Sequence, residues 1–405
     1  MDHLIGIGGV GMSALAHALI CVGHSVSGAD RLVSSTCGSV MPESLRRLAA
    51  LGVKVYPDDG SGIGPSVDRV IVSTAIEPQN PGLVRAKELG IPVVHRAAAL
   101  AEALSAYRLV AVAGTCGKST VTAMLSAILA DCGLDPFCVN GAAVVGWNGS
   151  VRDGKGVYAV AEVDESDRSL TAFSPYAAIV TNASADHYSK DEMDAVFDAF
   201  VANVPGPVVD GRKVRYDADC SMPGAHNRQN AGIALAMAMA LGVDEAKARG
   251  ALANFKGVER RMQFIGRCGG ADVYDDYAHN PEKLHAMLAT LQDKYPKGVA
   301  VVWRPHGYGP LRKMFSPLAD MFNAQLRPQD RLIVLPVYDA GGTADRSLQS
   351  DVLVAAVQGS SFIGTPEEAL RLLKAQAPAF GAVVIAGARD PGLPALARGL
   401  AENKE

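Results

Sequence analysis

Short apolar runs alternate with helical patterns along nearly the whole chain, and this alternation decides the fold class. At the N-terminus, the apolar run 4–7 is followed by a helical pattern over 12–22 and a second strand pattern over 25–29. Strand–helix alternation with short loops is typical of parallel strands with helices packed on both faces. The sequence therefore predicts an α/β protein whose first block, from residue 4 to about 105, forms a parallel, doubly wound sheet.

The alternation falls into three blocks, and each block predicts one domain. A glycine-rich turn opens the first block, a second glycine-rich turn follows the strand pattern 108–113, and a third series of strands starts near Val273. A chain of 405 residues is long enough for two or three domains. We expect a Rossmann-like domain over 1–106, a central P-loop ATPase-like domain over 107–259 and a C-terminal Rossmann-like α/β domain over 260–405.

Composition excludes several classes of protein. Lys and Arg total 38 against 42 for Asp and Glu, so there is no electrostatic case for nucleic acid or an anionic membrane. The seven cysteines contain no CxxC pair, which is typical of a reducing compartment. The N-terminus lacks the basic segment of a signal peptide, and the apolar run 231–241 is too short to span a bilayer. We expect a cytoplasmic protein without membrane insertion.

The first glycine-rich turn, GIGGVG over 6–11, lies directly between a strand and a helix. Glycines allow a tight turn and let backbone N–H groups approach a diphosphate at the helix N-terminus. Asp30 ends the second strand, where an acidic residue usually meets a ribose hydroxyl. Taken alone, this turn favours a nicotinamide or flavin dehydrogenase.

The second turn, GTCGKST over 114–120, also joins a strand to a helix. Its backbone amides can cradle phosphates, Lys118 can neutralise their charge, and the Ser119 hydroxyl can bind Mg²⁺. The spacing departs from the strict P-loop motif because Val112 stands where the first glycine would be. The context still predicts ATP binding, and a P-loop beside a Rossmann-like turn weakens the dehydrogenase interpretation.

Acidic and polar residues follow the next two strands, as EVDESD over 162–167 and as TNASADH over 181–187. Carboxylates at the carboxyl ends of parallel strands, beside a P-loop, are placed to hold Mg²⁺ directly or through water. Without a P-loop, an acidic cluster would be a solvated loop about as often as a metal site. The combination predicts a metal site.

In this order the motifs resemble those of the Mur ligase family, and most closely its UDP-N-acetylmuramate–L-alanine ligase branch. The matching segments cover nearly the whole chain: GIGGVGMSALA (6–16), VSGAD (26–30), STAIEPQNP (73–81), AGTCGKST (113–120), EVDESD (162–167), VTNASADH (180–187), GAHNRQN (224–230), GVERR (257–261), DDYAHNP (275–281) and RPH (304–306).

The resemblance implies two nucleotide sites. In the first domain a UDP-linked acid replaces the nicotinamide, with residues along the diphosphate and near the nucleoside: Gly8, Gly9, Gly11, Met12, Asp30, Ser73 and Thr74. ATP is bound by the P-loop, by two asparagines facing adenine and by an arginine at the domain boundary: Gly114, Thr115, Gly117, Lys118, Ser119, Thr120, Asn227, Asn230 and Arg261.

The resemblance also implies the catalytic groups, namely Lys118, Glu162, His187 and His279. Ser119, Glu162 and His187 are the metal ligands that it implies, although imidazole is a poor ligand for Mg²⁺. His279, within DDYAHNP, would close over the site from the third domain together with Asp276, Tyr277 and Asn280.

The activity implied is an ATP-dependent, ADP- and phosphate-forming amide ligase of peptidoglycan precursor synthesis. Its cofactors would be ATP and Mg²⁺, and its partners a UDP-N-acetylmuramate-like acid and an amino acid or amine. Two alternatives stay open: a Mur-like ligase of another pathway that joins a different acid and amine, and a non-catalytic nucleotide-binding relative.

The sequence departs from this branch at the acceptor end. Gly307 and Pro310 stand where the branch carries arginines that position the carboxylate of the incoming amino acid, and Arg312 is our first candidate to replace them. The stretch between His187 and Gly224 is shorter than in this branch. The helix expected over 191–203 contains no lysine that could be carbamoylated as in sibling ligases, unless Lys190 serves. Cys116 stands where the branch usually has histidine, and its position beside Lys118 favours a reactive thiol.

Overall fold

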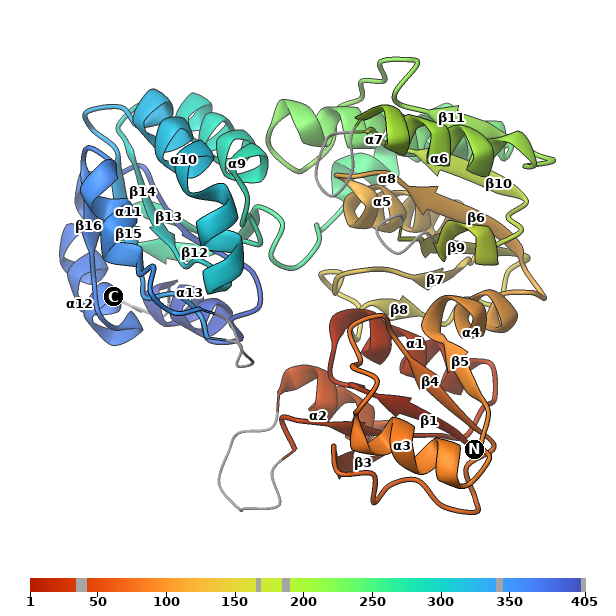
Figure 1. Ribbon diagram of the computed structural model, residues 1–405. Coiled ribbons are helices and arrows are strands. Elements are labelled where there is room, and N and C mark those ends of the chain that lie inside the picture. Colours follow the sequence, from red (N-terminus) through yellow and green to blue (C-terminus); the bar gives the residue numbers. More distant parts are fainter. Residues whose placement is uncertain (34–41, 165–168, 184–189, 340–344, 402–405) are drawn as a thin grey trace. The chain divides into compact units, whose positions relative to one another are not determined.

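The computed structural model describes residues 1–33, 42–164, 169–183, 190–339 and 345–401, and it contains three sheets with helices packed against them (Figure 1). The chain forms two compact units. One consists of Met1–Ser221 and Asn227–Gly257, and the other of Met222–His226 and Val258–Glu405. The first unit contains two sheets and the second contains one.

The first sheet has five parallel strands in the order β3-β2-β1-β4-β5. Because β2 and β4 flank β1 on opposite sides, the chain turns away in opposite directions at the carboxyl end of β1, where α/β sheets bind ligands. The elements are β1 (Asp2–Ile5), α1 (Val10–Cys21), β2 (Val26–Asp30), α2 (Glu43–Ala50), β3 (Lys54–Pro57), β4 (Arg69–Val72), α3 (Pro81–Glu88), β5 (Val93–His95) and α4 (Arg96–Ala103).

The central sheet has the order β11-β10-β6-β9-β7-β8, so that the P-loop strand β6 lies between β9 and β10. Its elements are β6 (Arg108–Ala113), α5 (Lys118–Asp131), β7 (Phe137–Val139), β8 (Val151–Arg152), β9 (Tyr158–Glu162), η1 (Ser169–Ala172), β10 (Ala177–Val180), α6 (Lys190–Ala202), β11 (Val208–Asp210), α7 (Ala225–Ala240) and α8 (Glu245–Asn254). One apolar cluster joins it to the first sheet, from Leu4 and Leu15 to Ala161 and Phe197.

The third sheet has the order β12-β13-β17-β14-β15-β16. Helices cover both of its faces, because Val384 of β17 packs with α9, α10 and α11 while the next residue, Ile385, packs with α12 and α13. Its elements are β12 (Gln263–Cys268), β13 (Ala271–Asp276), α9 (Pro281–Lys294), β14 (Val299–Trp303), α10 (Tyr308–Gln325), β15 (Arg331–Val334), α11 (Ser350–Ala356), β16 (Ser360–Phe362), α12 (Pro366–Gln376), η2 (Ala377–Ala379), β17 (Ala382–Ala386) and α13 (Leu393–Ala401).

The predicted α/β class is confirmed, and the first sheet is parallel throughout, as predicted. The central and third sheets each carry one antiparallel strand at an edge. Strand β8 pairs antiparallel with β7, and β12 pairs antiparallel with β13. The strands of the third domain therefore begin at Gln263, ten residues before the predicted first strand near Val273. The side chains of β12 are mostly half-exposed, and an irregularity between Phe264 and Gly266 breaks its register, so the strand lacks a continuous apolar run. No helix among the described residues is long and apolar enough to cross a membrane.

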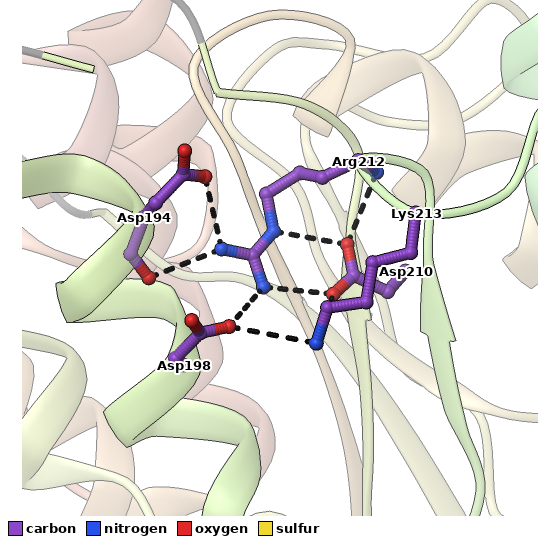
Figure 2. A network of polar contacts seen from close by, with 5 residues as sticks. All are labelled: Asp194, Asp198, Asp210, Arg212 and Lys213. Carbon is purple, nitrogen blue, oxygen red and sulfur yellow. Dashed lines mark hydrogen bonds and ion pairs between the residues drawn. The ribbon is translucent and has the colours of Figure 1, made fainter. Parts of the chain in front are cut away.

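A polar network fixes helix α6 against the edge strand β11 (Figure 2). The Arg212 guanidinium is almost buried and forms two hydrogen bonds to the Asp210 carboxylate, at 3.0 and 2.7 Å. It also reaches Asp194 at 3.1 Å and Asp198 at 2.8 Å on α6. Burial raises the pKa of Asp210, but the hydrogen bonds from Arg212 outweigh burial and hold it below the usual 3.8. The ionised form of the Asp210 carboxylate is thus stabilised by the Arg212 guanidinium.

Replacing Arg212 with methionine should lower the free energy of unfolding of the first unit by about 3 kcal/mol at pH 7, since it removes both hydrogen bonds to the buried Asp210 carboxylate. Lys213, 3.6 Å from Asp210 Oδ2, would then be the cation that remains near this charge. The folded pKa of Asp210 is depressed, so the contribution of the pair is present above about pH 4 and is lost as the pH falls through that pKa. Urea titrations at pH 7 and pH 3 check both effects. Arg249→Met, which removes an exposed pair with Glu245, is the control and should cost less than about 0.5 kcal/mol. Equal losses in the two variants would contradict the assignment.

Candidate functional site

The first glycine-rich turn lies at the carboxyl end of β1, as predicted, and Asp30 holds it in place. The backbone N–H of Gly8 donates to Asp30 Oδ2 at 2.8 Å, and the N–H of Leu32 donates to Oδ1 at 2.9 Å. Helix α1 starts after Gly9 without a side-chain cap, so its first amides remain available to an anion. The Met12 side chain is buried in the core, which leaves only its backbone for a ligand.

Two further loops end beside this turn. Ser73 and Thr74 follow β4, the neighbour of β1, and are half-buried and exposed respectively. Arg96 begins α4, and its Nη1 lies 3.3 Å from the point where a Cβ would stand on Gly11. The same guanidinium bonds Asp164, two residues after β9, through Nη2 at 3.0 Å. Arg96 thus connects the start of α1 with the carboxyl end of a central strand, a link that no sequence spacing indicated.

The P-loop follows β6 and is anchored by the residues after β10. The backbone N–H of Cys116 donates to Asn182 Oδ1 at 2.9 Å, and Asn182 Nδ2 donates to the Cys116 carbonyl at 2.9 Å. The Thr181 hydroxyl donates to the same carbonyl at 2.6 Å. The Lys118 ammonium donates to the Gly114 carbonyl at 2.6 Å, so the lysine lies against its own loop. Asn182 therefore holds both the backbone N–H and the backbone carbonyl of Cys116.

Helix α7 supports the loop from another direction. Gly117 has a φ of 85°, which favours glycine, and a Cβ there would lie 2.5 Å from Asn230 Oδ1. Asn230 is buried, as is Asn227 one turn earlier on the same helix. Ser119 and Thr120, in the first turn of α5, are also buried. The predicted asparagine pair thus lies in the same unit as the P-loop, and Asn230 packs against the loop itself.

Glu162 is the last residue of β9 and pairs in register with Val112 of β6, so it reaches the same sheet edge as the P-loop. Its Oε2 accepts a hydrogen bond from the Gly141 N–H at 2.9 Å, in the loop after β7. Oε1 has no hydrogen-bond partner among the described residues. His187 lies outside the described residues. Within them there is no group of three His, Cys, Asp or Glu side chains that could hold a metal.

In the second unit, the DDYAHNP segment forms a compact turn at the end of β13. Burial raises the pKa of Asp276, whose two oxygens accept the backbone N–H groups of Met262 and Ala278, each at 2.7 Å. Arg261 lies over the Tyr277 ring, 5.2 Å from its centre. Asn280 caps α9 by accepting the Lys283 N–H.

His279 is held in its neutral form. Burial, together with the nearby charge of Lys283, lowers its pKa to about 3. Its Nδ1 lies 2.9 Å from the Tyr277 carbonyl, which can only accept a hydrogen bond, so Nδ1 carries the proton and Nε2 is the acceptor. The ring meets that of His306 edge to face at 4.9 Å.

The structure thus brings most predicted P-loop and metal residues to one edge of the central sheet, with the first glycine-rich turn in the same unit. Arg261 and His279 belong to the second unit. The sequence analysis missed Arg96, and it did not single out the roles of Thr181, Asn182 and Asp164 as contacts. The motifs that contain Thr181, Asn182 and Asp164 could be recognised in the sequence. Their contacts could not, because they form only when β9, β6 and β10 lie side by side.

A strand, a tight loop and a helix that begins with Lys118 and Ser119, next to an acidic strand end, define a P-loop α/β protein. Two family profiles narrow the class: one described as "Mur ligase family, catalytic domain" matches residues 3–108, and one described as "Mur ligase, glutamate ligase domain" matches 260–389. The chain belongs to the Mur ligase family and is a ligase.

Individual relatives agree with this assignment. The chain is 31% identical to the UDP-N-acetylmuramate–L-alanine ligase of Agrobacterium fabrum, over 88% of this chain and 86% of that protein. It is 33% identical to the ligase of the same name from Methylobacterium nodulans, with the same coverage. Among solved structures, the UDP-N-acetylmuramate–alanine ligase of Thermotoga maritima superposes with a TM-score of 0.81 at 24% identity, over 99% of this chain and 98% of that one. A murein peptide ligase from Psychrobacter arcticus gives a TM-score of 0.67 at 20% identity, covering 100% and 99%.

Replacing Asn182 with alanine should weaken nucleotide binding about tenfold, because the Cys116 peptide loses two hydrogen bonds that order the P-loop. A second variant, Asn182→Asp, keeps the acceptor for the Cys116 N–H but places another acceptor against the Cys116 carbonyl. This variant should also bind ATP poorly. Calorimetric titration with ATP measures both. Wild-type affinity in the alanine variant would show that the loop is ordered without Asn182.

Proposed function

We propose that the protein joins a UDP-N-acetylmuramate-like acid to an amino acid at the expense of ATP, with L-alanine as the leading amine. The observation that carries the proposal is the carboxyl edge of the central sheet, where the P-loop, Ser119 and Glu162 meet. The named relatives support the choice of substrates, since they are UDP-N-acetylmuramate–L-alanine ligases that this chain matches over most of its length.

The chemistry follows from the weakness of a carboxylate as an electrophile. One carboxylate oxygen attacks the γ-phosphorus of ATP, ADP leaves, and the acid becomes an acyl phosphate. The amine nitrogen then attacks the acyl carbon, the tetrahedral intermediate collapses with loss of inorganic phosphate, and the amine gives up a proton. Electrostatic stabilisation of the phosphoryl group is the main contribution that a protein makes to the first step.

In this scheme the P-loop binds the ATP phosphates. The amides at the start of α5 face the phosphates, the Lys118 ammonium leaves the Gly114 carbonyl to meet them, and Gly114, Thr115, Gly117, Ser119 and Thr120 shape the loop. Asn227 and Asn230 are assigned to the adenine side and Arg261 to phosphate contacts. The proposed division of the chain is 1–106 for the UDP-linked acid, 107–259 for ATP and 260–405 for the amino acid.

Magnesium fits the donors at this edge. Glu162 offers an oxygen that the Gly141 amide does not use, and Ser119 adds a hydroxyl at the helix start. Mg²⁺ is usually held by one or two protein oxygens together with phosphate and water, so this set suffices, with His187 as a further ligand. When bound, the ion would neutralise charge on the phosphates.

The first sheet binds the UDP part of the acid in the proposed scheme. Gly8, Gly9, Gly11 and the Met12 backbone line the diphosphate, and Asp30, Ser73 and Thr74 lie near the nucleoside. Asp30 acts mainly by holding the Gly8 amide, because both of its oxygens are already engaged by backbone N–H groups. We also propose a cytoplasmic location, because the reaction consumes ATP.

One observation favours a second candidate, a Mur-type ligase with a different acid and amine. Gly307 and Pro310 remove two cations from the acceptor end, while the ATP-binding edge keeps its lysine, serine and glutamate. An amine without a carboxylate would not need those cations.

A phosphate-release assay with UDP-N-acetylmuramate, ATP and a panel of amino acids tests the proposal. Release that depends on both the acid and L-alanine is expected, and Lys118→Ala should reduce it to a few per cent or less of wild type while the fold is retained. Release with another amine but not with L-alanine would favour the second candidate. Dependence on no amine at all would contradict ligase activity.

Replacing Glu162 with glutamine should raise the Mg²⁺ concentration needed for half-maximal activity about tenfold, because it removes one anionic ligand but keeps an acceptor for the Gly141 N–H. The control is Asp131→Asn, which removes one charge from the exposed far end of α5 and should leave the Mg²⁺ dependence unchanged. A Glu162→Gln enzyme with the Mg²⁺ dependence of wild type would rule out Glu162 as a ligand.

A further inference from the structure

The segment 304–310 has a glycine and a proline at the two positions where the family resemblance implies arginines, and the cations nearest in sequence are Arg304, Arg312 and the exposed Lys313. A lysine carries a point charge without the planar pair of donors that an arginine offers to a carboxylate. Gly307 caps α10 with a φ of 156°, a value that L side chains rarely adopt, and Pro310 lies in the first helical turn. The loop is therefore built around a glycine. Position 307 cannot regain an arginine without changing its backbone.

The two arginines closest in sequence are already engaged. Arg304 bonds Asp390 Oδ2 at 2.7 Å and the Pro336 carbonyl at 3.0 Å. Arg312, our first candidate from the sequence, lies 2.8 Å from Asp345 Oδ2 and donates to the Ser347 hydroxyl at 3.0 Å. Each would have to give up an ion pair to bind a substrate carboxylate.

Arg389 is different, because it lies on a strained turn. Its φ is 63°, and the Asp390 N–H donates to the Ala388 carbonyl at 2.8 Å across it. A hydrogen bond between residues i and i+2 around a positive φ makes a γ-turn of the rare, strained form. Ala388 and Asp390 are buried while Arg389 is exposed. Strain of this kind persists where the surroundings enforce it, often at functional sites.

The surroundings of Arg389 place it at the ligand-binding edge of the sheet. Strand β17, which ends at Ala386, pairs in parallel with β14, and the Arg304 N–H donates to the Ala386 carbonyl at 3.1 Å. The turn at 387–390 therefore runs beside the segment that contains His306 and Gly307. The Arg304–Asp390 ion pair ties the two segments together.

The charged groups around Arg389 favour the binding of an anion at the carboxyl edge of the third sheet. Asp390 is neutralised by Arg304, and its second oxygen accepts the Gly392 N–H at 2.8 Å. Burial, together with the nearby charges of Arg389 and Lys283, lowers the pKa of His306 to about 4, so the imidazole is neutral at pH 7. Arg389 makes no ion pair with any described residue.

We propose that Arg389 binds the α-carboxylate of the incoming amino acid, in place of the cations missing at 307 and 310. The guanidinium presents a planar pair of donors that matches a carboxylate. The assignment rests on the proposed function, and it makes Arg389 a specificity residue that favours a free amino acid over its amide.

The test compares L-alanine with L-alaninamide in the phosphate-release assay. Arg389→Gly suits the backbone, because glycine adopts a positive φ without strain, so any loss comes from the side chain. It should raise the KM for L-alanine about 10- to 100-fold and leave the KM values for ATP and L-alaninamide unchanged. The KM for L-alanine of Arg389→Lys should lie between those of the wild type and Arg389→Gly, because lysine keeps the positive charge but lacks the planar pair of donors.

Two contrast variants sharpen the result. Arg331→Ala removes one exposed charge at the amino end of β15, the opposite edge of the sheet, and should leave the preference for L-alanine intact. Arg312→Ala tests the competing candidate. If Arg312→Ala lost the preference and Arg389→Gly kept it, the assignment would be wrong. An active wild type whose Arg389→Gly variant discriminates equally well would also overturn it, whereas a wild type with no amine-dependent release would overturn the proposed function as well.

Discussion

Parallel pairing of β9, β6 and β10 places three segments at one sheet edge, and the site depends on that pairing. The Val163 N–H donates to the Val112 carbonyl at 3.0 Å and the Thr181 N–H to the Ala113 carbonyl at 2.9 Å, so the P-loop leaves the sheet between two fixed neighbours. From one side Glu162 supplies a carboxylate, and from the other Asn182 holds the Cys116 peptide. A slip of one residue in either ladder would turn these side chains to the opposite face.

The same unit joins the two nucleotide sites that we propose. Arg96 lies against Gly11 at the start of α1 and bonds Asp164, close to Glu162 in sequence. This ion pair is partly exposed, and the apolar cluster that the first and central sheets share packs the elements that carry it. In the proposed reaction, an acid bound on the first sheet must meet ATP bound on the second, and a short ionic contact between their loops fits that requirement.

The sequence was a good guide where the signal is local. Both glycine-rich turns, the α/β class and the strand carrying Glu162 follow from residues adjacent in the chain. The short strand β8 and the half-exposed β12 escaped because neither has a continuous apolar run. Asn182, Arg96 and Arg389 escaped for another reason. Their roles depend on partners far away in sequence, or on one backbone angle, and residue spacing encodes neither.

In the proposed reaction, ATP activates the carboxylate of a UDP-linked acid as an acyl phosphate. Isotope transfer tests it directly, with UDP-N-acetylmuramate carrying oxygen-18 in its carboxylate, ATP and L-alanine, and mass spectrometry of the released phosphate. Our account predicts that each turnover moves one labelled oxygen from the carboxylate into phosphate. Unlabelled phosphate released in step with amide formation would contradict it.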